Sequence, residues 1–126
     1  MTLYIDDTTI PNSEDLYRRI HPSQWKLVEN THTFRVTSAA FKDHRCQISV
    51  DLSSLTTPQD ALARASQKEI KYALAAVTAG DARQIEQKII RDPAPNDPAH
   101  ALIVGQQPPH VSKALAQAAK WIIPPT

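Results

Sequence analysis

The stretch Cys46-Gln47-Ile48-Ser49-Val50-Asp51-Leu52 decides the fold, because apolar and polar residues alternate strictly along it. A period of two places successive side chains on opposite faces of a strand. The segment therefore predicts a strand with one buried face and one solvated face. A one-sided strand of this kind is typical of antiparallel or mixed sheets rather than of doubly wound parallel ones.

Further strands are predicted on both sides of this segment. Residues 72–79 are almost wholly apolar, which indicates a strand covered on both faces, with a buried helix segment as the alternative. Residues 101–104 form a short apolar run that ends at Gly105. Upstream, the polar residues 30–33 predict a turn between two short extended pieces, 26–28 and 34–36.

The first predicted helix covers residues 14–20. Leu16 and Ile20 are spaced by one helical turn, so they fall on one apolar stripe. Pro22 cannot continue a helix and ends the segment.

Three more helices are predicted downstream. Thr57 and Pro58 suit the N-cap and the first helical position of a helix that ends near residue 66. The apolar spacing favours a helix over 82–90, with a strand as the open alternative, and another over 110–121.

Together these segments predict one small α+β domain over residues 1–126, with residues 1–12 as an irregular N-terminal arm. We expect a mixed or antiparallel sheet of about four to five strands with about three to four helices. With Gly80 and Gly105 as its two glycines, the chain has no glycine-rich phosphate loop.

Charge and cysteine content set the expected environment. Fourteen basic residues against thirteen acidic ones give a net charge of +1, which is no strong sign of nucleic-acid binding. One cysteine allows no internal disulfide, and no run of apolar residues is long enough for a membrane helix. The first residues lack the pattern of a secretory signal. These features predict a cytoplasmic protein.

The basic pair Arg18-Arg19 followed by His21-Pro22 is the densest polar cluster. Two guanidinium groups can hold a phosphate or carboxylate, and His21 can act as an acid or a base or contact the same anion. Alternatively, the arginines are the solvated side of the first helix and His21 is its C-terminal cap.

Two other polar positions join this cluster as candidate ligand-binding residues. The loop 92–98 has three prolines and delivers His100 to the start of an apolar strand, as a rigid loop would aim one side chain into a site. The alternative is a histidine at the edge of the core. Ser38 can line a pocket next to a strand, although a turn former is the simpler interpretation.

His44 and Cys46 are spaced so that both would face one side of a strand, as half of a zinc site would. No second pair of ligands accompanies them, and a lone buried cysteine behaves as a small apolar residue. We therefore expect no metal and no cofactor.

The segments Arg18-Arg19-Ile20-His21-Pro22, 38–43 (Ser-Ala-Ala-Phe-Lys-Asp) and 97–101 (Asp-Pro-Ala-His-Ala) resemble a family of short bacterial proteins with no established activity. The resemblance implies a bacterial, single-domain protein and transfers no functional residue. A weaker likeness links the chain to ADP-ribosyltransferase-type folds. Those enzymes often have an early arginine or histidine and then a serine- or threonine-rich strand, roles that Arg18, Arg19 or His21 and Thr37-Ser38 could fill. They also use a late glutamate, for which Glu69 and Glu86 are the candidates here.

Two classes of function follow. The first is a bacterial interaction or accessory protein whose partner is another protein. The alternative is an enzyme or binder of a nucleotide-like or phosphorylated ligand. An ADP-ribosyltransferase-like activity is one form that this alternative takes. Its ligand-binding residues would be Arg18, Arg19, His21, Ser38 and His100. No catalytic residue is assigned.

Overall fold

The computed structural model describes residues 4–65 and 67–126 of the chain. Eight strands, three α-helices and three short 3-10 helices occur in these two ranges. The strands are β1 (Asp15–Ile20), β2 (Trp25–Leu27), β3 (Phe34–Val36), β4 (Gln47–Leu52), β5 (Ala73–Thr78), β6 (Lys88–Arg91), β7 (His100–Val104) and β8 (Lys120–Ile123). The helices are α1 (Pro58–Ala63), α2 (Ala79–Gln84) and α3 (Pro109–Ala118), with 3-10 helices η1 (Pro22–Gln24), η2 (Ser38–Phe41) and η3 (Ser53–Leu55).

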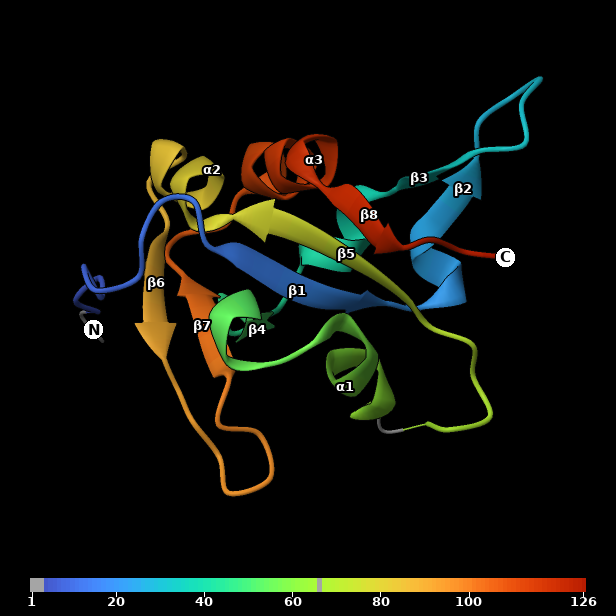
Figure 1. Cartoon of the computed structure of the whole chain (residues 1–126). Coiled ribbons are helices and arrows are strands. Elements are labelled where there is room, and N and C mark those ends of the chain that lie inside the picture. Colours follow the sequence, from blue (N-terminus) through green and yellow to red (C-terminus); the bar gives the residue numbers. More distant parts are fainter. Residues whose placement is uncertain (1–3, 66) are drawn as a thin grey trace.

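Six of the strands form one antiparallel sheet in the order β6-β7-β4-β1-β5-β8. Strands β2 and β3 form a separate antiparallel pair, which extends away from the main sheet (Figure 1). The predicted fold, with about four to five strands in one sheet, is therefore wrong, because the described chain has eight strands in two sheets. The central position of β1 and the added edge strands β6 and β8 account for most of the difference.

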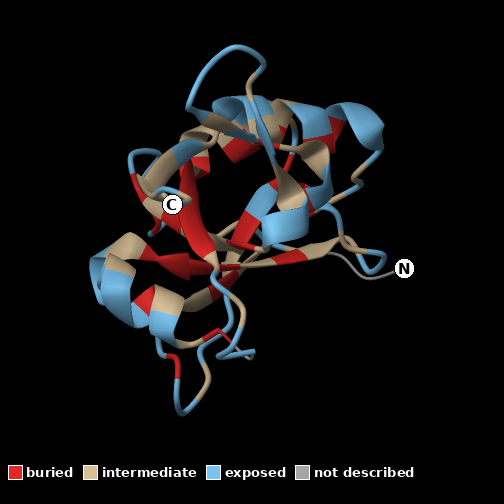
Figure 2. Cartoon of the chain, turned by 90° about the vertical axis from the view of Figure 1, so that its right-hand side faces the viewer, coloured by how far each residue is buried: buried red, intermediate tan, exposed pale blue. Residues whose placement is uncertain are grey.

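Helices α2 and α3 lie on one face of the main sheet, and α1 lies on the other (Figure 1). The core fills the space under α2 and α3, where Val111 and Leu115 of α3 are buried together with Leu16, Ile48 and Val50 from the strands. Figure 2 shows these buried segments as the interior of the domain, with exposed residues on the outer sides of the helices. The predicted burial of alternate residues along β4 is confirmed for Ile48, Val50 and Leu52.

The opposite face of the sheet is partly polar. There α1 contacts β1 and β5, and Ala61 of α1 and Leu74 of β5 are fully buried. The cross-strand register places Tyr17 opposite Asp51 on this face, and Asp51 in turn opposite His100. This face therefore combines a small apolar contact with a row of polar side chains.

The predicted helix over 14–20 is wrong, because residues 15–20 form the strand β1 at the centre of the sheet. Leu16 and Ile20 fit both a helical stripe and alternate positions of a strand, and both are fully buried. Arg18 occupies the position between them on the same face, so a charged residue interrupts the apolar period of two. The strand is nevertheless stable, since it pairs with β5 over all six residues.

The range 82–90, for which a helix was favoured and a strand left open, contains both, since it includes the end of α2 and most of the strand β6. The predicted helix over 110–121 ends early, at Ala118, and β8 follows it. No glycine or proline separates the two elements, so the sequence carries no stop signal there. Cys46 was expected on the buried face of β4 but precedes that strand, half-buried, with a φ of 58°.

Other predicted elements are confirmed. The hairpin of β2 and β3 has the expected turn, and β7 and β5 lie where apolar runs predicted them. Helix α1 begins as expected, because the Thr57 hydroxyl oxygen accepts a hydrogen bond of 3.1 Å from the backbone N–H of Asp60. Residues 4–12 have no helix or strand, yet Asp7 donates its backbone N–H to Ile89 of β6 and Ile10 is buried in the core.

Candidate ligand-binding site

The ladder between β1 and β4 is short. These strands pair at Leu16–Leu52 and Tyr17–Asp51, whereas β1 pairs with β5 over six residue pairs. Beyond Tyr17 the two strands separate, and the Arg18 side chain bridges the gap. Its Nη1 donates to the carbonyl oxygen of Ser49 at 2.8 Å and its Nε donates to that of Ala40 at 3.0 Å.

Arg18 is charged at neutral pH despite this setting. Burial lowers the pKa of its guanidinium to about 10, and the positive charge of Arg19 lowers it further, while Asp43 opposes both effects. A group with that pKa is protonated at pH 7. The gap between the two strands therefore contains a fixed positive charge.

A cleft of about 390 Å3 opens at this point of the sheet. The side chains that give it its chemical character are three guanidinium groups and three aromatic rings, from Arg18, Arg19, Arg64, Tyr17, His21 and Tyr72. We call it the arginine cleft. Its walls come from β1, η1 with its cap, β4, the segment after α1 and the residue before β5, which are far apart in the sequence.

Arg19 and Arg64 are held by a buried carboxylate at the floor of the polar sheet face. Asp51 Oδ2 lies 3.2 Å from Arg19 Nη1 and 3.4 Å from Arg64 Nη1, and its side chain is 1% exposed. Arg64 Nη1 also lies 3.4 Å from Asp97 Oδ1, and Arg19 Nη1 donates to the carbonyl oxygen of Ala61 at 2.9 Å. The two arginines are thus positioned by contacts to α1, to β4 and to the loop before β7.

The pKa of Asp51 is raised to about 6. Burial is the main cause, followed by the hydrogen bond that protonated Asp51 donates to the neighbouring Asp97 carboxylate and by the negative charge of Asp97. The positive charges of Arg19 and Arg64 act in the opposite direction. Asp51 therefore changes its protonation state within the physiological range of pH.

His21 lies at the mouth of the cleft and caps η1, not the end of a helix as expected. Its Nδ1 accepts a hydrogen bond of 3.0 Å from the backbone N–H of Ser23, so in the neutral ring the proton lies on Nε2. The ring meets Tyr72 edge to face, with ring centroids 5.7 Å apart. These contacts fix the orientation of the imidazole and direct its N–H away from η1.

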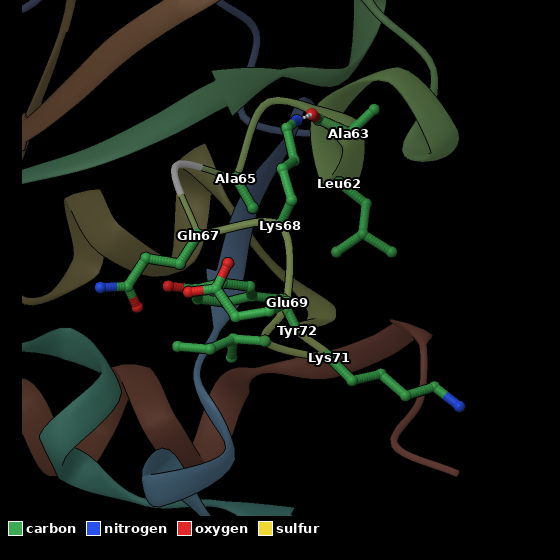
Figure 3. A pocket seen from close by; sticks show the side chains of 9 residues that line it. Leu62, Ala63, Ala65, Gln67, Lys68, Glu69, Lys71 and Tyr72 are labelled. Carbon is green, nitrogen blue, oxygen red and sulfur yellow. Dashed lines mark hydrogen bonds between the residues drawn. The ribbon is translucent and has the colours of Figure 1, made fainter.

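A second hollow adjoins the arginine cleft. It has a volume of about 430 Å3 and shares Ala65 and Tyr72 with the cleft. Figure 3 shows the side chains that line it, with Lys68 Nζ donating to the carbonyl oxygen of Ala63 and Lys71 directed away from the other side chains. Tyr72 thus belongs to both hollows.

The structure brings three of the five expected ligand-binding residues together, since Arg18, Arg19 and His21 line the arginine cleft. Ser38 instead lines a separate groove between β3 and α3. His100 is on the same sheet face, but its Nδ1 lies 3.0 Å from the carbonyl oxygen of Asp92 and 3.1 Å from the carboxylate of that residue. Strand geometry separates the backbones of His21 and His100 by roughly 16 Å, because two strand spacings and four residues lie between them.

Sequence reasoning missed Arg64 and Tyr72, which line the cleft, and Asp51 and Asp97, whose carboxyl groups lie against its arginines. Asp51 is at a polar position of the alternating strand, and such a position usually faces solvent. Helix α1 and the loop 92–99 bury it, which no local pattern indicates. Arg64 and Tyr72 carry no sequence signal, since their relevance depends on the pairing of β5 with β1.

No protein-family model matches the chain, and no curated protein or solved structure is significantly similar to it. The resemblance to a bacterial family therefore stays a prediction. No helix in the part of the chain that the structure describes has the length and apolar character needed to cross a bilayer. Among the described residues, no three His, Cys, Asp or Glu side chains gather as metal ligands would.

Proposed function

We propose that the protein binds a phosphorylated, nucleotide-like small molecule in the arginine cleft. The observation that carries the proposal is the convergence of Arg18, Arg19 and Arg64 on one hollow of about 390 Å3. Ligand pockets commonly measure about 300–1,000 Å3, and guanidinium groups are the side chains best suited to bind phosphate through paired hydrogen bonds.

The charge of the site favours an anion. Three guanidinium groups line the cleft, and two carboxylates, Asp51 and Asp97, lie behind Arg19 and Arg64, so the cluster has an excess of positive charge even when both carboxylates are ionised. Among the described residues, the bonds of Arg19 and Arg64 to these carboxylates are made through Nη1. The Nη2 groups of both arginines are therefore the donors that a phosphate would engage.

The aromatic side chains favour a ligand with a flat ring. Tyr72 and His21 stand at the mouth of the cleft with their rings edge to face. A nucleobase could lie against either ring while its phosphate reached the arginines, since bases stack on aromatic side chains. Tyr72 also lines the second hollow, which gives room for the part of a ligand that extends beyond the arginines.

Binding is proposed here without transfer of ADP-ribose. The late glutamate that such chemistry would use is not among the lining residues of the arginine cleft. Glu69 lines the neighbouring hollow, and Glu86 follows α2, a helix on the opposite face of the sheet from α1. The role as an interaction protein stays a prediction.

Titration of the protein with AMP, ADP, inorganic pyrophosphate and adenosine, followed by calorimetry, tests the proposal. We expect the phosphorylated compounds to bind and adenosine to bind much more weakly. Arg64→Gln should weaken binding about 10- to 150-fold, since a hydrogen bond to a charged group contributes roughly 1.5–3 kcal/mol.

Lys113→Gln is the matched control, because it removes one positive charge from the separate groove beside α3. It should leave the affinity within about twofold, as expected for a distant exposed charge. Equal losses in Arg64→Gln and Lys113→Gln would mean that binding is non-specific attraction to basic surface. No binding of any phosphorylated compound would refute the proposal.

A further inference from the structure

We infer that the carboxyl pair Asp51–Asp97 couples anion binding in the arginine cleft to the uptake of a proton. This inference rests on the proposed function, because it concerns the regulation of the same cleft. It follows from the position of the pair behind the two arginines that an anion would contact.

The two carboxyl groups are buried and incompletely paired. Their side chains are 1% and 11% exposed for Asp51 and Asp97. Within residues 4–65 and 67–126, neither Asp51 Oδ1 nor Asp97 Oδ1 accepts a hydrogen bond from a nitrogen donor or a hydroxyl group, although Asp97 Oδ1 has the ion-pair contact of 3.4 Å with Arg64 Nη1. A buried acceptor without a donor is costly, and one proton between two adjacent carboxyl oxygens satisfies both.

The titration of Asp51 supports this arrangement. Its pKa is raised to about 6, first by burial and then by the hydrogen bond with Asp97 and the charge of Asp97. Arg19 and Arg64 oppose the rise, because their charges stabilise the ionised carboxylate. The protonation state of Asp51 thus depends on how strongly these two arginines interact with it.

Arg19 and Arg64 form the physical link between the pair and the cleft. Each contacts Asp51 Oδ2 through Nη1 and also lines the cleft. A bound anion adds negative charge beside both guanidinium groups, and this weakens their stabilisation of ionised Asp51. The carboxyl group then takes up a proton, and conversely a protonated pair leaves more positive charge for the anion.

Other titratable groups surround the pair and enter the design of the test. On β1, Tyr17 is opposite Asp51 in the register, and on β7 His100 is opposite it from the other side. The loop before β7 contributes Asp97 itself and Asp92, which contacts His100. At the mouth of the cleft, His21 can also bind a proton together with an anion. Control variants are therefore needed for His21 and His100.

Sulfate is a suitable probe, since it stays fully ionised between pH 5 and pH 8. We propose to measure its binding by calorimetry at constant ionic strength across that range. Affinity should rise as pH falls from about 7 to about 5, by at most about tenfold per pH unit, which is the limit for uptake of one proton. Calorimetry in two buffers with different ionisation enthalpies reports the proton uptake directly.

Asp51→Asn imitates the protonated carboxyl group. This variant should bind sulfate at pH 7.5 about as tightly as the unmodified protein does at pH 5.5, with little dependence on pH. Asp97→Asn removes the neighbouring negative charge and should also lose most of the pH dependence. The pH dependence should persist in His21→Gln and in His100→Gln.

The outcomes separate the two proposals. If sulfate, pyrophosphate and the nucleotides all fail to bind at every pH, both the proposed function and the coupling are refuted. If they bind but the pH dependence survives in both Asp51→Asn and Asp97→Asn, only the coupling is refuted. Loss of the pH dependence in His21→Gln would assign the proton to the imidazole and would likewise refute the coupling. If either aspartate variant fails to fold, proton uptake measured in the His21→Gln and His100→Gln proteins decides the question.

Discussion

Replacement of Asp51 by Asn should change how the stability of the protein depends on pH. The folded-state pKa of Asp51 is about 6, above its ordinary value of 3.8. Because the folded protein holds this proton more tightly than the unfolded chain, the contribution of Asp51 to stability falls as pH rises from about 4 to about 6 and is constant above that range. Asn does not titrate, so the stability of the variant should lack this dependence on pH.

The size of the effect follows from the shift. A displacement from 3.8 to about 6 is roughly two pKa units, and each unit corresponds to about 1.4 kcal/mol. The difference in unfolding free energy, variant minus unmodified protein, should therefore increase by up to about 3 kcal/mol between pH 4 and pH 7. Urea denaturation of both proteins at half-unit steps of pH measures it.

Asp7→Asn is the matched control, because the pKa of Asp7 is shifted in the opposite direction to that of Asp51. Hydrogen bonds from the Thr9 hydroxyl group and the Thr9 backbone N–H lower the pKa of Asp7, and Arg91 adds to the effect. Its contribution to stability is present above pH 4 and is lost as pH falls through the lowered pKa. Parallel pH profiles for the unmodified protein and Asp51→Asn between pH 4 and pH 7 would refute the raised pKa and with it the account of the buried pair.

Three other substitutions test the packing. Val50→Asp should destabilise the protein by several kcal/mol, roughly 3 or more, because Val50 is 3% exposed and faces the core; an unchanged thermal melt would contradict the assigned faces of β4. Ser112→Ala should lower the free energy of unfolding, measured by urea denaturation, by about 1–3 kcal/mol, since the buried Ser112 hydroxyl group donates to the carbonyl oxygen of Phe41 at 2.8 Å. A decrease smaller than the error of the method would mean that water replaces this hydrogen bond. Gly105→Ala should lower the melting temperature, because Gly105 has a φ of 145° and an added Cβ would lie 2.9 Å from Gln87 Oε1. Gly80→Ala is the comparison, since Gly80 has no positive φ. A smaller decrease in melting temperature for Gly105→Ala than for Gly80→Ala would contradict this reasoning.

Local patterns predicted the elements whose signal is complete within the segment. The alternation of β4 and the Thr57-Pro58 start of α1 depend on neighbouring residues alone, and both are confirmed. Strand β1 was missed because Arg18 interrupts its apolar alternation. The carbonyl groups that make this arginine acceptable in a strand, at Ala40 and Ser49, come from distant segments. A reader of the sequence sees the charge and not its partners.

The candidate site, like the fold, was predictable from the sequence only in part. The unusual density of charge at Arg18, Arg19 and His21 marked one wall of the arginine cleft correctly as a group. His100 stood out for its proline-rich loop, but that loop directs Asp97 toward Arg64 and holds the His100 ring against Asp92. A rigid loop thus indicates that some side chain is positioned, without identifying which one.

The short ladder between β1 and β4 divides the main sheet into two leaves of three strands, β6-β7-β4 and β1-β5-β8. Two residue pairs, the Arg18 side chain and the Arg19–Asp51 ion pair join the leaves, and this seam has the shortest ladder of the sheet, so we expect it to be the weakest line. Arg18 acts as a clasp across it, with its Cα in one leaf and its Ser49 partner in the other. The arginine cleft is lined by residues of both leaves, from β1 and from Ser49 of β4. A molecule bound there would contact both leaves and slow their separation.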